Sequence, residues 1–435
     1  MSVIDTKSEP ASLDDIDLND GARFVQGVPF EWFRYLRREH PVYRHRNVGS
    51  RYDSYWCVTR YEDCVRVNRD VEHFSSARGG VVLADLEPSN LERQRLMMLN
   101  MDPPMHTRYR RLVNKGFTPR MVRDLEARIE QYADRIIDDV CERGEADFVV
   151  DLAAELPLLV IAEIMGVPEE DRHRVFDWSN RMIGRDDPEY MPANRLREGD
   201  DAGAVEEAVA EESMRASAEL FAYADVLTAQ KRAHPSEDVL SVLTRAEIDG
   251  ESLSQVELDL FFLLLAVAGN ETTRNLMSGA MTAFFEHPDE WRRLRQDRSL
   301  LPRAIEEMLR FVTPVMHFRR DVIEDCELGG RRLRADDKVV FWHISANRDE
   351  TVFADPDRFD VGRDPNPHIA FGGGGPHFCL GANLARMEIK VMFDRLLDRL
   401  PDLAQAGPPQ RLYSNFINGT KHLPVTFEPR APLAR

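Results

Sequence analysis

The spacing of apolar residues predicts a long buried helix in the second half of the chain. Ser254 and Glu257 match a capping box, which marks a helix N-terminus. Apolar periodicity then continues to about Phe285, just before Pro288. The pattern covers roughly 30 residues, or about 45 Å at 1.5 Å per residue. Because its middle is apolar on nearly every side, we expect this helix to pass through the core.

Shorter patterns predict more helices and a few strands. Apolar spacing indicates further helices over 120–142, 302–311 and 381–400. Aromatic and β-branched stretches indicate strands over 339–342 and 423–427, and strands followed by a helix over 51–68. Strands and helices do not alternate, so a doubly wound sheet is not expected. The sequence therefore predicts a mainly α fold with small β-sheets.

The composition along the chain predicts a short tail and a single domain that contains one long loop. Residues 1–20 are acidic and polar and are expected to be a flexible tail, which leaves 21–435 as a single domain. The segment 186–203 is rich in Pro, Gly and charge and is expected to be a mobile loop between two helices. The N-terminus has neither a basic nor an apolar leader region, and the longest apolar run, 260–269, is about half of a bilayer span. We therefore expect no membrane anchor and a cytoplasmic protein.

Charge and cysteine content narrow the class of protein. The 435 residues include 57 Lys and Arg against 76 Asp and Glu, a net charge of −19 that disfavours nucleic-acid binding. Apolar residues make up 43% and charged residues 31%, which is typical of a globular protein. Five cysteines without a CxxC pair do not form a disulfide framework and suit a reducing compartment. They are Cys57, Cys64, Cys141, Cys326 and Cys379.

The segment 371–381, FGGGGPHFCLG, carries the clearest chemical signal. Four consecutive glycines let the backbone approach a flat or bulky group. Cys379 follows at the start of a predicted helix, where free amides and the helix dipole stabilise a thiolate. No second Cys or His stands at zinc spacing, and a P-loop would continue with Lys-Ser/Thr. A buried structural cysteine is the alternative, but one thiolate in a glycine collar suits haem iron.

This segment resembles the haem-binding segment of the cytochrome P-450 family. Phe371 stands eight residues before Cys379, one more than the commonest family spacing, and a subgroup of bacterial members has the same extra residue. AGNETTRN at 268–275, DPNPH at 364–368 and GANLAR at 381–386 are similar to bacterial hydroxylases of sterol side chains and methyl-branched lipids. The resemblance implies the cytochrome P-450 fold, with haem b between the long central helix and the helix that follows the Cys loop.

Polar residues interrupt the predicted central helix between Ala268 and Thr273. A glycine weakens a helix by up to ~1 kcal/mol, and a Thr hydroxyl can bond the carbonyl four residues back, so a local distortion is expected. By resemblance this is the oxygen-binding groove. Glu271 would relay protons and Thr272 would hydrogen-bond dioxygen, as the two catalytic residues, and Ala268 would contact the cofactor. A solvent-facing polar stripe is the alternative, which the leucines before it disfavour.

The resemblance also assigns residues around the cofactor. Cys379 is the axial thiolate of the iron. His106 and Arg110 lie one helical turn apart, and arginine suits the carboxylates of haem. Arg319 is the alternative to Arg320, because the doublet leaves the register open by one residue. The full set of cofactor contacts is Ala268, His106, Arg110, Arg320, Phe371, Gly372, His377 and Gly381. Glu307, Arg310 and Arg358 are expected to form a buried structural triad without chemistry.

The implied activity is hydroxylation of an unactivated C–H bond in a hydrophobic substrate, with O2 and two electrons. The substrate would be a steroid side chain, a terpenoid or a branched lipid, held by Met98, Val267, Val315, Met316, Phe416 and Ile417, although methionines also fill cores. The chain has no flavin or iron–sulfur segment, so a ferredoxin and its reductase are the expected electron donors. A candidate docking patch is Arg111, Lys115, Arg120, Arg386 and Lys390.

Two other functions stay open from the sequence alone. A non-catalytic thiolate-haem binding or sensor protein would not need Glu271 and Thr272 together. A peroxide-driven haem enzyme would be favoured by loss of the threonine. Because both residues are present, the monooxygenase is the preferred interpretation.

Overall fold

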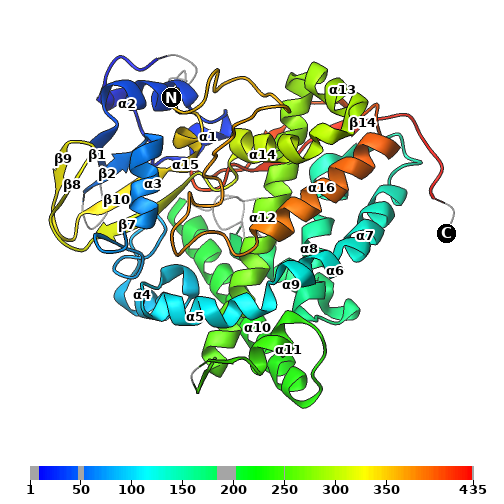
Figure 1. Cartoon of the computed structure of the whole chain (residues 1–435), viewed down its shortest axis with the longest axis horizontal. Helices are drawn as coiled ribbons and strands as arrows, with labels where there is room; N and C mark the ends of the chain where they lie inside the picture. Colours follow the sequence, from blue (N-terminus) through cyan, green and yellow to red (C-terminus); the bar gives the residue numbers. More distant parts are fainter. Residues whose placement is uncertain (1–8, 48–52, 184–201, 249, 434–435) are drawn as a thin grey trace.

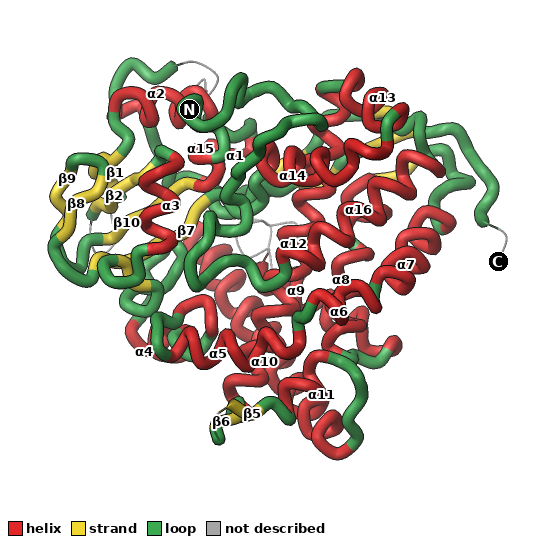
Figure 2. Tube along the Cα trace, in the orientation of Figure 1, coloured by secondary structure: helices red, strands yellow, loops and turns green. Residues whose placement is uncertain are grey.

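A computed structural model describes residues 9–47, 53–183, 202–248 and 250–433. Figure 1 shows one long helix, α12 (Gln255–Glu286), running through the middle of the molecule. Most helices gather around it, and Figure 2 shows the larger sheet set to one side of them. The other α-helices are α1 (Gly21–Val25), α2 (Phe30–Glu39), α3 (Tyr61–Arg69), α4 (Pro88–Gln94), α5 (Met105–Val113), α6 (Pro119–Asp124), α7 (Glu126–Asp138), α8 (Glu155–Met165), α9 (Arg172–Ile183), α10 (Ala202–Ala233), α11 (Val239–Thr244), α13 (Pro288–Gln296), α14 (Leu301–Val312), α15 (His343–Ala346) and α16 (Ala382–Arg399).

The strands form one five-stranded sheet and four small ones, and the mainly α prediction is confirmed. The large sheet has the order β1-β2-β10-β7-β3, in which β2 and β10 are parallel and the other pairs antiparallel. Its strands are β1 (Val42–Arg46), β2 (Ser54–Val58), β3 (Phe74–Ser75), β7 (His317–Val322) and β10 (Lys338–Trp342). The small sheets pair β11 (Ala404–Gln405) and β4 (Glu145–Asp147) with β14 (Pro424–Thr426), β12 (Gln410–Arg411) with β13 (Thr420–His422), β5 (Glu247–Ile248) with β6 (Glu251–Ser252), and β8 (Cys326–Leu328) with β9 (Arg331–Leu333).

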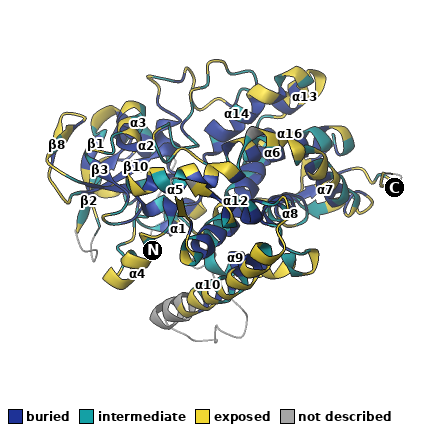
Figure 3. Ribbon diagram, turned by 60° about the horizontal axis from the view of Figure 1, so that its bottom comes forward, coloured by how far each residue is buried: buried dark blue, intermediate teal, exposed yellow. Residues whose placement is uncertain are grey.

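The central helix begins as the sequence predicts. Ser254 Oγ accepts from the Glu257 amide at 3.3 Å, and Glu257 Oε2 accepts from the Ser254 amide at 2.8 Å. Along the chain α12 packs against α8, α9, α10, α14 and α16. Figure 3 shows it as a mostly buried element, whereas α10 keeps one exposed face. A helix that is apolar on nearly all sides is stabilised by burial on nearly all sides.

Most of the predicted elements are confirmed, with shifted ends. The helices expected at 302–311 and 381–400 are α14 and α16, and the strands expected at 339–342 and 423–427 are β10 and β14. The helix expected over 120–142 is broken at Leu125 into α6 and α7. Within 51–68 a single strand, β2, precedes α3, and the strand that pairs with β2 is the earlier β1. Of the loop expected at 186–203, residues 186–201 lie outside the described residues, and α10 begins at Ala202.

The prediction of a flexible tail over 1–20 is wrong for residues 9–20, and residues 1–8 lie outside the described part. Ile16 and Leu18 are 4% and 0% exposed and pack in the core cluster beside the large sheet. The Leu18 amide donates to His45 Nε2 at 3.2 Å. Two apolar side chains among the acidic residues are therefore sufficient to fix this segment on the domain.

Candidate functional site

The glycine run before Cys379 adopts a backbone that only glycine accepts without strain. Its φ angles are +97°, +62°, +98° and +80° from Gly372 to Gly375. A Cβ on Gly375 would lie 2.5 Å from the Asn68 carbonyl oxygen, so the loop packs directly on the end of α3. The Cys379 amide donates to the Phe371 carbonyl at 3.0 Å and closes the loop. Cys379 is thereby presented immediately before α16.

The environment of the Cys379 sulfur fits a metal-bound thiolate. Cys379 keeps accessible surface. Desolvation raises the pKa of the thiol, and a hydrogen bond from the Gly381 amide and the charges of Arg110 and Arg386 offset part of that rise. Within the described residues, no group of three His, Cys, Asp or Glu side chains can hold a metal. A metal bound here would thus take its other ligands from a cofactor.

The predicted oxygen side lies on an uncovered face of α12. Ala268 is exposed although it lies mid-way along a core helix, and Ala266 and Asn270 beside it are 2% and 0% exposed. Thr272 is partly exposed, and its hydroxyl donates to the Ala268 carbonyl at 2.8 Å. The back-bonded threonine is the local feature that the sequence predicts. This face of α12 has room for a group that the described side chains do not supply.

Glu271 lies beside Thr272 in sequence but on a different, buried side of the helix. Its carboxylate is 3% exposed, accepts a hydrogen bond from Arg274 and lies 3.4 Å from Asn275 Nδ2. Burial raises the pKa of Glu271, and the Arg274 charge and the Asn275 bond lower it. Burial is the largest of these influences, so the pKa of Glu271 lies above its ordinary value.

Four predicted cofactor residues gather at one place. The rings of His106 and His377 lie 4.1 Å apart, and His106 is 1% exposed with no partner for either ring nitrogen. Burial and then the charges of Arg110 and Arg320 lower the pKa of His106 to about 4. Burial, Arg320, His106 and Arg110 also lower the pKa of His377 to about 2, while a bond from its ring to the Met101 carbonyl opposes this. This buried electropositive cluster fits the two carboxylates of haem.

The structure distinguishes between the two neighbouring arginines. Arg319 is paired with Asp85 and Asp321, both at 2.8 Å. Arg320 donates to the Arg319 carbonyl at 2.7 Å, and no carboxylate in the described chain pairs with its guanidinium. Burial lowers the pKa of Arg320 to about 10. Arg320, rather than Arg319, is therefore the cation available to an anionic cofactor.

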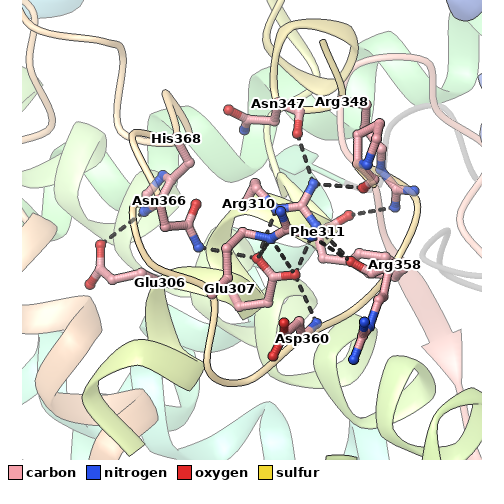
Figure 4. Close-up of polar contacts among 12 residues, drawn as sticks. Glu306, Glu307, Arg310, Phe311, Asn347, Arg348, Arg358, Asp360, Asn366 and His368 are labelled. Atoms are coloured by element: carbon pink, nitrogen blue, oxygen red, sulfur yellow. Dashed lines mark hydrogen bonds and ion pairs between the residues drawn. The ribbon is translucent and has the colours of Figure 1, made fainter. Parts of the chain in front are cut away.

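Figure 4 shows Glu307, Arg310 and Arg358, the three residues of the predicted structural triad. The structure confirms the first two as a buried pair and replaces the third. Arg310 binds Glu307 through two bonds of 2.7 and 2.8 Å, and both side chains are fully buried. The third member is Arg363, whose Nε lies 3.1 and 3.2 Å from the Glu307 oxygens, with Asn366 at 3.1 Å. The prediction of Arg358 is wrong, because its side chain is exposed and only its carbonyl accepts from Arg310 and Arg363. Arginines are close together in this segment, and no sequence signal separates them.

Other predicted residues are placed as follows. The Arg386 guanidinium lies 4.7 Å from the centre of the Phe371 ring, so Phe371 packs at the base of α16. Val267, Val315 and Phe416 are partly exposed, as pocket walls must be. Met316 is 0% exposed within the cluster under the large sheet, so its prediction as a pocket wall is wrong. Met98 and Ile417 are 7% and 8% exposed and are mainly core residues.

The candidate docking cations have partners on their own chain. Arg386 pairs with Glu306 at 2.6 Å, Lys390 pairs with Glu126 at 2.8 Å, and Arg120 lies 3.8 Å from Asp124. Lys115 donates to the Glu247 carbonyl at 2.8 Å. These cations therefore form a mixed-charge surface, and a partner must compete with the carboxylates or accept them.

Two further sequence predictions can be compared with the structure. All five cysteines are free, in agreement with the absence of a disulfide framework. In the part of the chain that the structure describes, no helix is long and apolar enough to cross a membrane.

Comparisons with known proteins agree with this geometry. The family model for cytochrome P450 matches residues 22–401. A steroid C26-monooxygenase of Rhodococcus jostii is 39% identical over 97% of this chain and 86% of the relative, and a methyl-branched lipid omega-hydroxylase of Mycobacterium tuberculosis is 39% identical over 96% and 92%. A cytochrome P450 of Mycobacterium marinum, solved in complex with pseudoionone, superposes with a TM-score of 0.84 and 38% identity over 98% of this chain and all of that one. A Bacillus megaterium cytochrome P450 in complex with testosterone gives 0.79 and 34%, over 92% of this chain and 99% of that one. The thiolate loop, the cation cluster and the fold thus have one common explanation: the chain belongs to the cytochrome P450 family.

Proposed function

We propose that this cytochrome P450 monooxygenase hydroxylates an unactivated C–H bond in a steroid side chain, a terpenoid or a branched lipid. The observation that carries the proposal is the presentation of Cys379, from a loop of four left-handed glycines, next to a buried cation cluster. The relatives in the comparison are named for steroid and methyl-branched lipid oxidation, which supports this substrate class. A non-catalytic haem sensor finds no support among them.

The residues of this chain fit haem b. The Cys379 thiolate would ligate the iron, and His106, Arg110, Arg320 and His377 would bind the carboxylates. Among the described residues, no carboxylate forms an ion pair with His106 or Arg320, although Asp102 and Asp321 lie near enough to act on Arg320. The bound group supplies activation of O2 by two electrons and two protons, and a thiolate ligand favours O–O cleavage.

Thr272 and Glu271 would manage protons on the oxygen side. The Thr272 hydroxyl, which bonds the Ala268 carbonyl in this structure, can turn its proton toward the uncovered face of α12. Glu271, held by Arg274 and Asn275, would supply protons to that hydroxyl after a rotation of its side chain.

The substrate would pack on apolar groups that keep open surface. Such groups are offered by Val267 of α12 and by Val315 and Phe416. The segments of Val315 and Phe416 are joined by the bridge between Val315 and Ile417. Apolar walls with few polar groups favour a hydrophobic ligand.

The free cysteines agree with a reducing, cytoplasmic location. A ferredoxin with its reductase would deliver the electrons.

The proposal is tested on the purified holoprotein. The reduced, carbon-monoxide-bound form is expected to show a Soret band shifted strongly to the red, and Cys379→Ser is expected to abolish that shift. Titration with a sterol bearing an aliphatic side chain, a terpenoid and a methyl-branched fatty acid should change the haem spin state for at least one of them. An unshifted Soret band in the wild-type protein would reject thiolate ligation.

A further inference from the structure

One turn of α12 carries buried polar atoms that no described residue satisfies. Asn270 is 0% exposed, and neither its Oδ1 nor its Nδ2 has a hydrogen-bond partner. In Glu271 the Oε2 atom accepts from Arg274, but Oε1 is buried and has no partner. Native proteins satisfy nearly all buried polar atoms, with ordered water where protein groups are lacking. Three such atoms on adjacent residues therefore point to a ligand.

Helix geometry places Asn270 on the side of α12 away from the predicted oxygen groove, and Glu271 between that side and the groove. At about 100° per residue, Asn270 and Glu271 are about 100° apart, and Arg274 lies between them in projection. Ala268 and Thr272 are each about 160° from Asn270, on either side of it. Glu271 thus stands between a closed polar face and the face that Thr272 shares with Ala268.

A third polar group reaches this face from another helix. Ser179 of α9 is 0% exposed and donates its hydroxyl to the Ala266 carbonyl of α12 at 3.1 Å. Ala266 is one turn before Asn270, so the Ser179 oxygen lies on the Asn270 side of α12. That oxygen keeps lone pairs for a further donor. A buried water needs two to four polar partners. The unpartnered atoms of Asn270 and Glu271 meet that number, and the Ser179 oxygen is a further polar group on the Asn270 side.

We infer that this turn of α12 binds buried water between Asn270 and Glu271, and that Asn270 is the positioning residue that holds it. The inference rests on the proposed function of Glu271 as proton carrier. When Glu271 releases a proton toward Thr272, this water passes a proton to Glu271 and takes one from a solvent water that enters the site, so that no hydroxide remains. No electron moves in this step. The water thus reloads Glu271 from the side opposite to the substrate.

The test compares Asn270→Leu with Ser278→Ala in the full-length holoprotein. Leucine is close to asparagine in size and removes both polar atoms, whereas the Ser278 hydroxyl lies on the same helix, is 0% exposed and already bonds the Arg274 carbonyl at 2.8 Å. For Asn270→Leu we expect product per reducing equivalent to fall, by less than the roughly 100-fold at which loss of a direct proton donor begins, because Asn270 acts through the water, and we expect a larger solvent isotope effect. Ser278→Ala should change neither quantity.

A second readout does not depend on activity. Magnetic relaxation dispersion of water oxygen-17 counts slowly exchanging buried waters in the wild-type protein, and Asn270→Leu should remove at least one. If the site holds no water, Asn270→Leu should leave the number of buried waters and the coupling unchanged. It should also raise the thermal midpoint, because the two unpartnered polar atoms of Asn270 are removed. That pattern would overturn the inference. If Asn270→Leu does not fold, Asn270→Ser keeps a water-binding hydroxyl and should retain wild-type coupling and water count.

Glu271→Gln tests the proton-carrier role of Glu271 separately from the water site at Asn270. If Glu271→Gln impairs coupling while Asn270→Leu leaves coupling and water count unchanged, the water site is wrong and the proposed proton carrier stands. If Glu271→Gln has no effect on coupling or isotope effect, the proposed role of Glu271 fails, and the inference fails with it.

Discussion

The strongest structural prediction concerns Arg363, which sequence alone does not distinguish from Arg358. Replacing Arg363 by Met removes two bonds to the buried Glu307 carboxylate and three bonds to the carbonyls of Ala354, Asp355 and Arg358. Removing one partner from a buried ion pair typically costs about 3–5 kcal/mol, because the remaining charge cannot return to water. Arg310 still binds Glu307, so the loss should fall near the lower end of that range.

Arg358→Met is the matched control, since its side chain is exposed and only its backbone carbonyl takes part in the network. A surface change of this type is expected to alter stability by less than about 0.5 kcal/mol. With an unfolding entropy near 2.1 cal/mol/K per residue, Arg363→Met should lower the thermal midpoint by about 3 °C or more and Arg358→Met by less than about 1 °C.

The assay is thermal unfolding of both variants by far-ultraviolet circular dichroism, together with the haem content after purification. Arg363→Met should also lower haem content, because the network joins α14 to the segment that leads into the Cys379 loop. Equal midpoints for the two variants, or a larger loss for Arg358→Met, would refute the assignment of Arg363 to the triad.

Three further predictions address the site and its surroundings. Thr272→Ala should lower product per reducing equivalent in favour of peroxide by up to about 100-fold, the lower limit for loss of a positioned proton donor, and Thr272→Ser should restore most of it. Unchanged peroxide yield would contradict the assignment. His317 is fully buried, and burial lowers its pKa to about 3 from the 6.5 of the unfolded chain, so the unfolded state binds more protons and stability should fall as pH drops from about 6.5 toward 3. His317→Phe should flatten that fall by about 1.4 kcal/mol per pH unit in urea titrations, and an unchanged slope would show that His317 is not neutral in the fold. Gly375→Ala should destabilise the protein by more than the ~1–2 kcal/mol of a left-handed residue, because its Cβ also meets the Asn68 carbonyl, whereas Gly407→Ala, with its nearest atom at 3.5 Å, should have little effect on the urea midpoint.

The sequence predicts well those features that are local in the chain. The capping box of α12, the bond from Thr272 to the Ala268 carbonyl and the glycine run are fixed by neighbouring residues, and the structure confirms each of them. The distortion expected near Ala268 does not break the helix, because α12 is continuous from Gln255 to Glu286. The roles of Glu271, Thr272 and the cofactor cations stay predictions, although their burial and proximity are as the proposal requires.

Features set by long-range packing could not be predicted in this way. The structure separates Arg363 from Arg358 by one contact: the Arg363 side chain reaches Glu307, which is more than fifty residues earlier in the chain, and the Arg358 side chain is exposed. Met316 is a flexible apolar residue of the kind that lines pockets, but it packs in the core cluster with Trp342 and Ile344. Residues 9–20 have a tail-like composition, yet Ile16 and Leu18 pack on the distant His45 and Trp342 region. In each case the deciding contact is with a segment remote in sequence.

The contact between the glycine loop and α3 means that substitutions in α3 can alter the surroundings of Cys379. Four successive residues of the loop contribute no side-chain atoms, so backbone hydrogen bonds and neighbouring segments hold its shape. The Arg69 guanidinium donates to the Gly373 carbonyl at 2.9 Å, and the backbone of Asn68 and Arg69 lies against Gly375. The surroundings of Cys379, the proposed iron ligand, are thus shaped by the end of a helix about three hundred residues earlier. Substitutions in α3 are therefore a route to altering those surroundings without changing any residue near Cys379 in sequence.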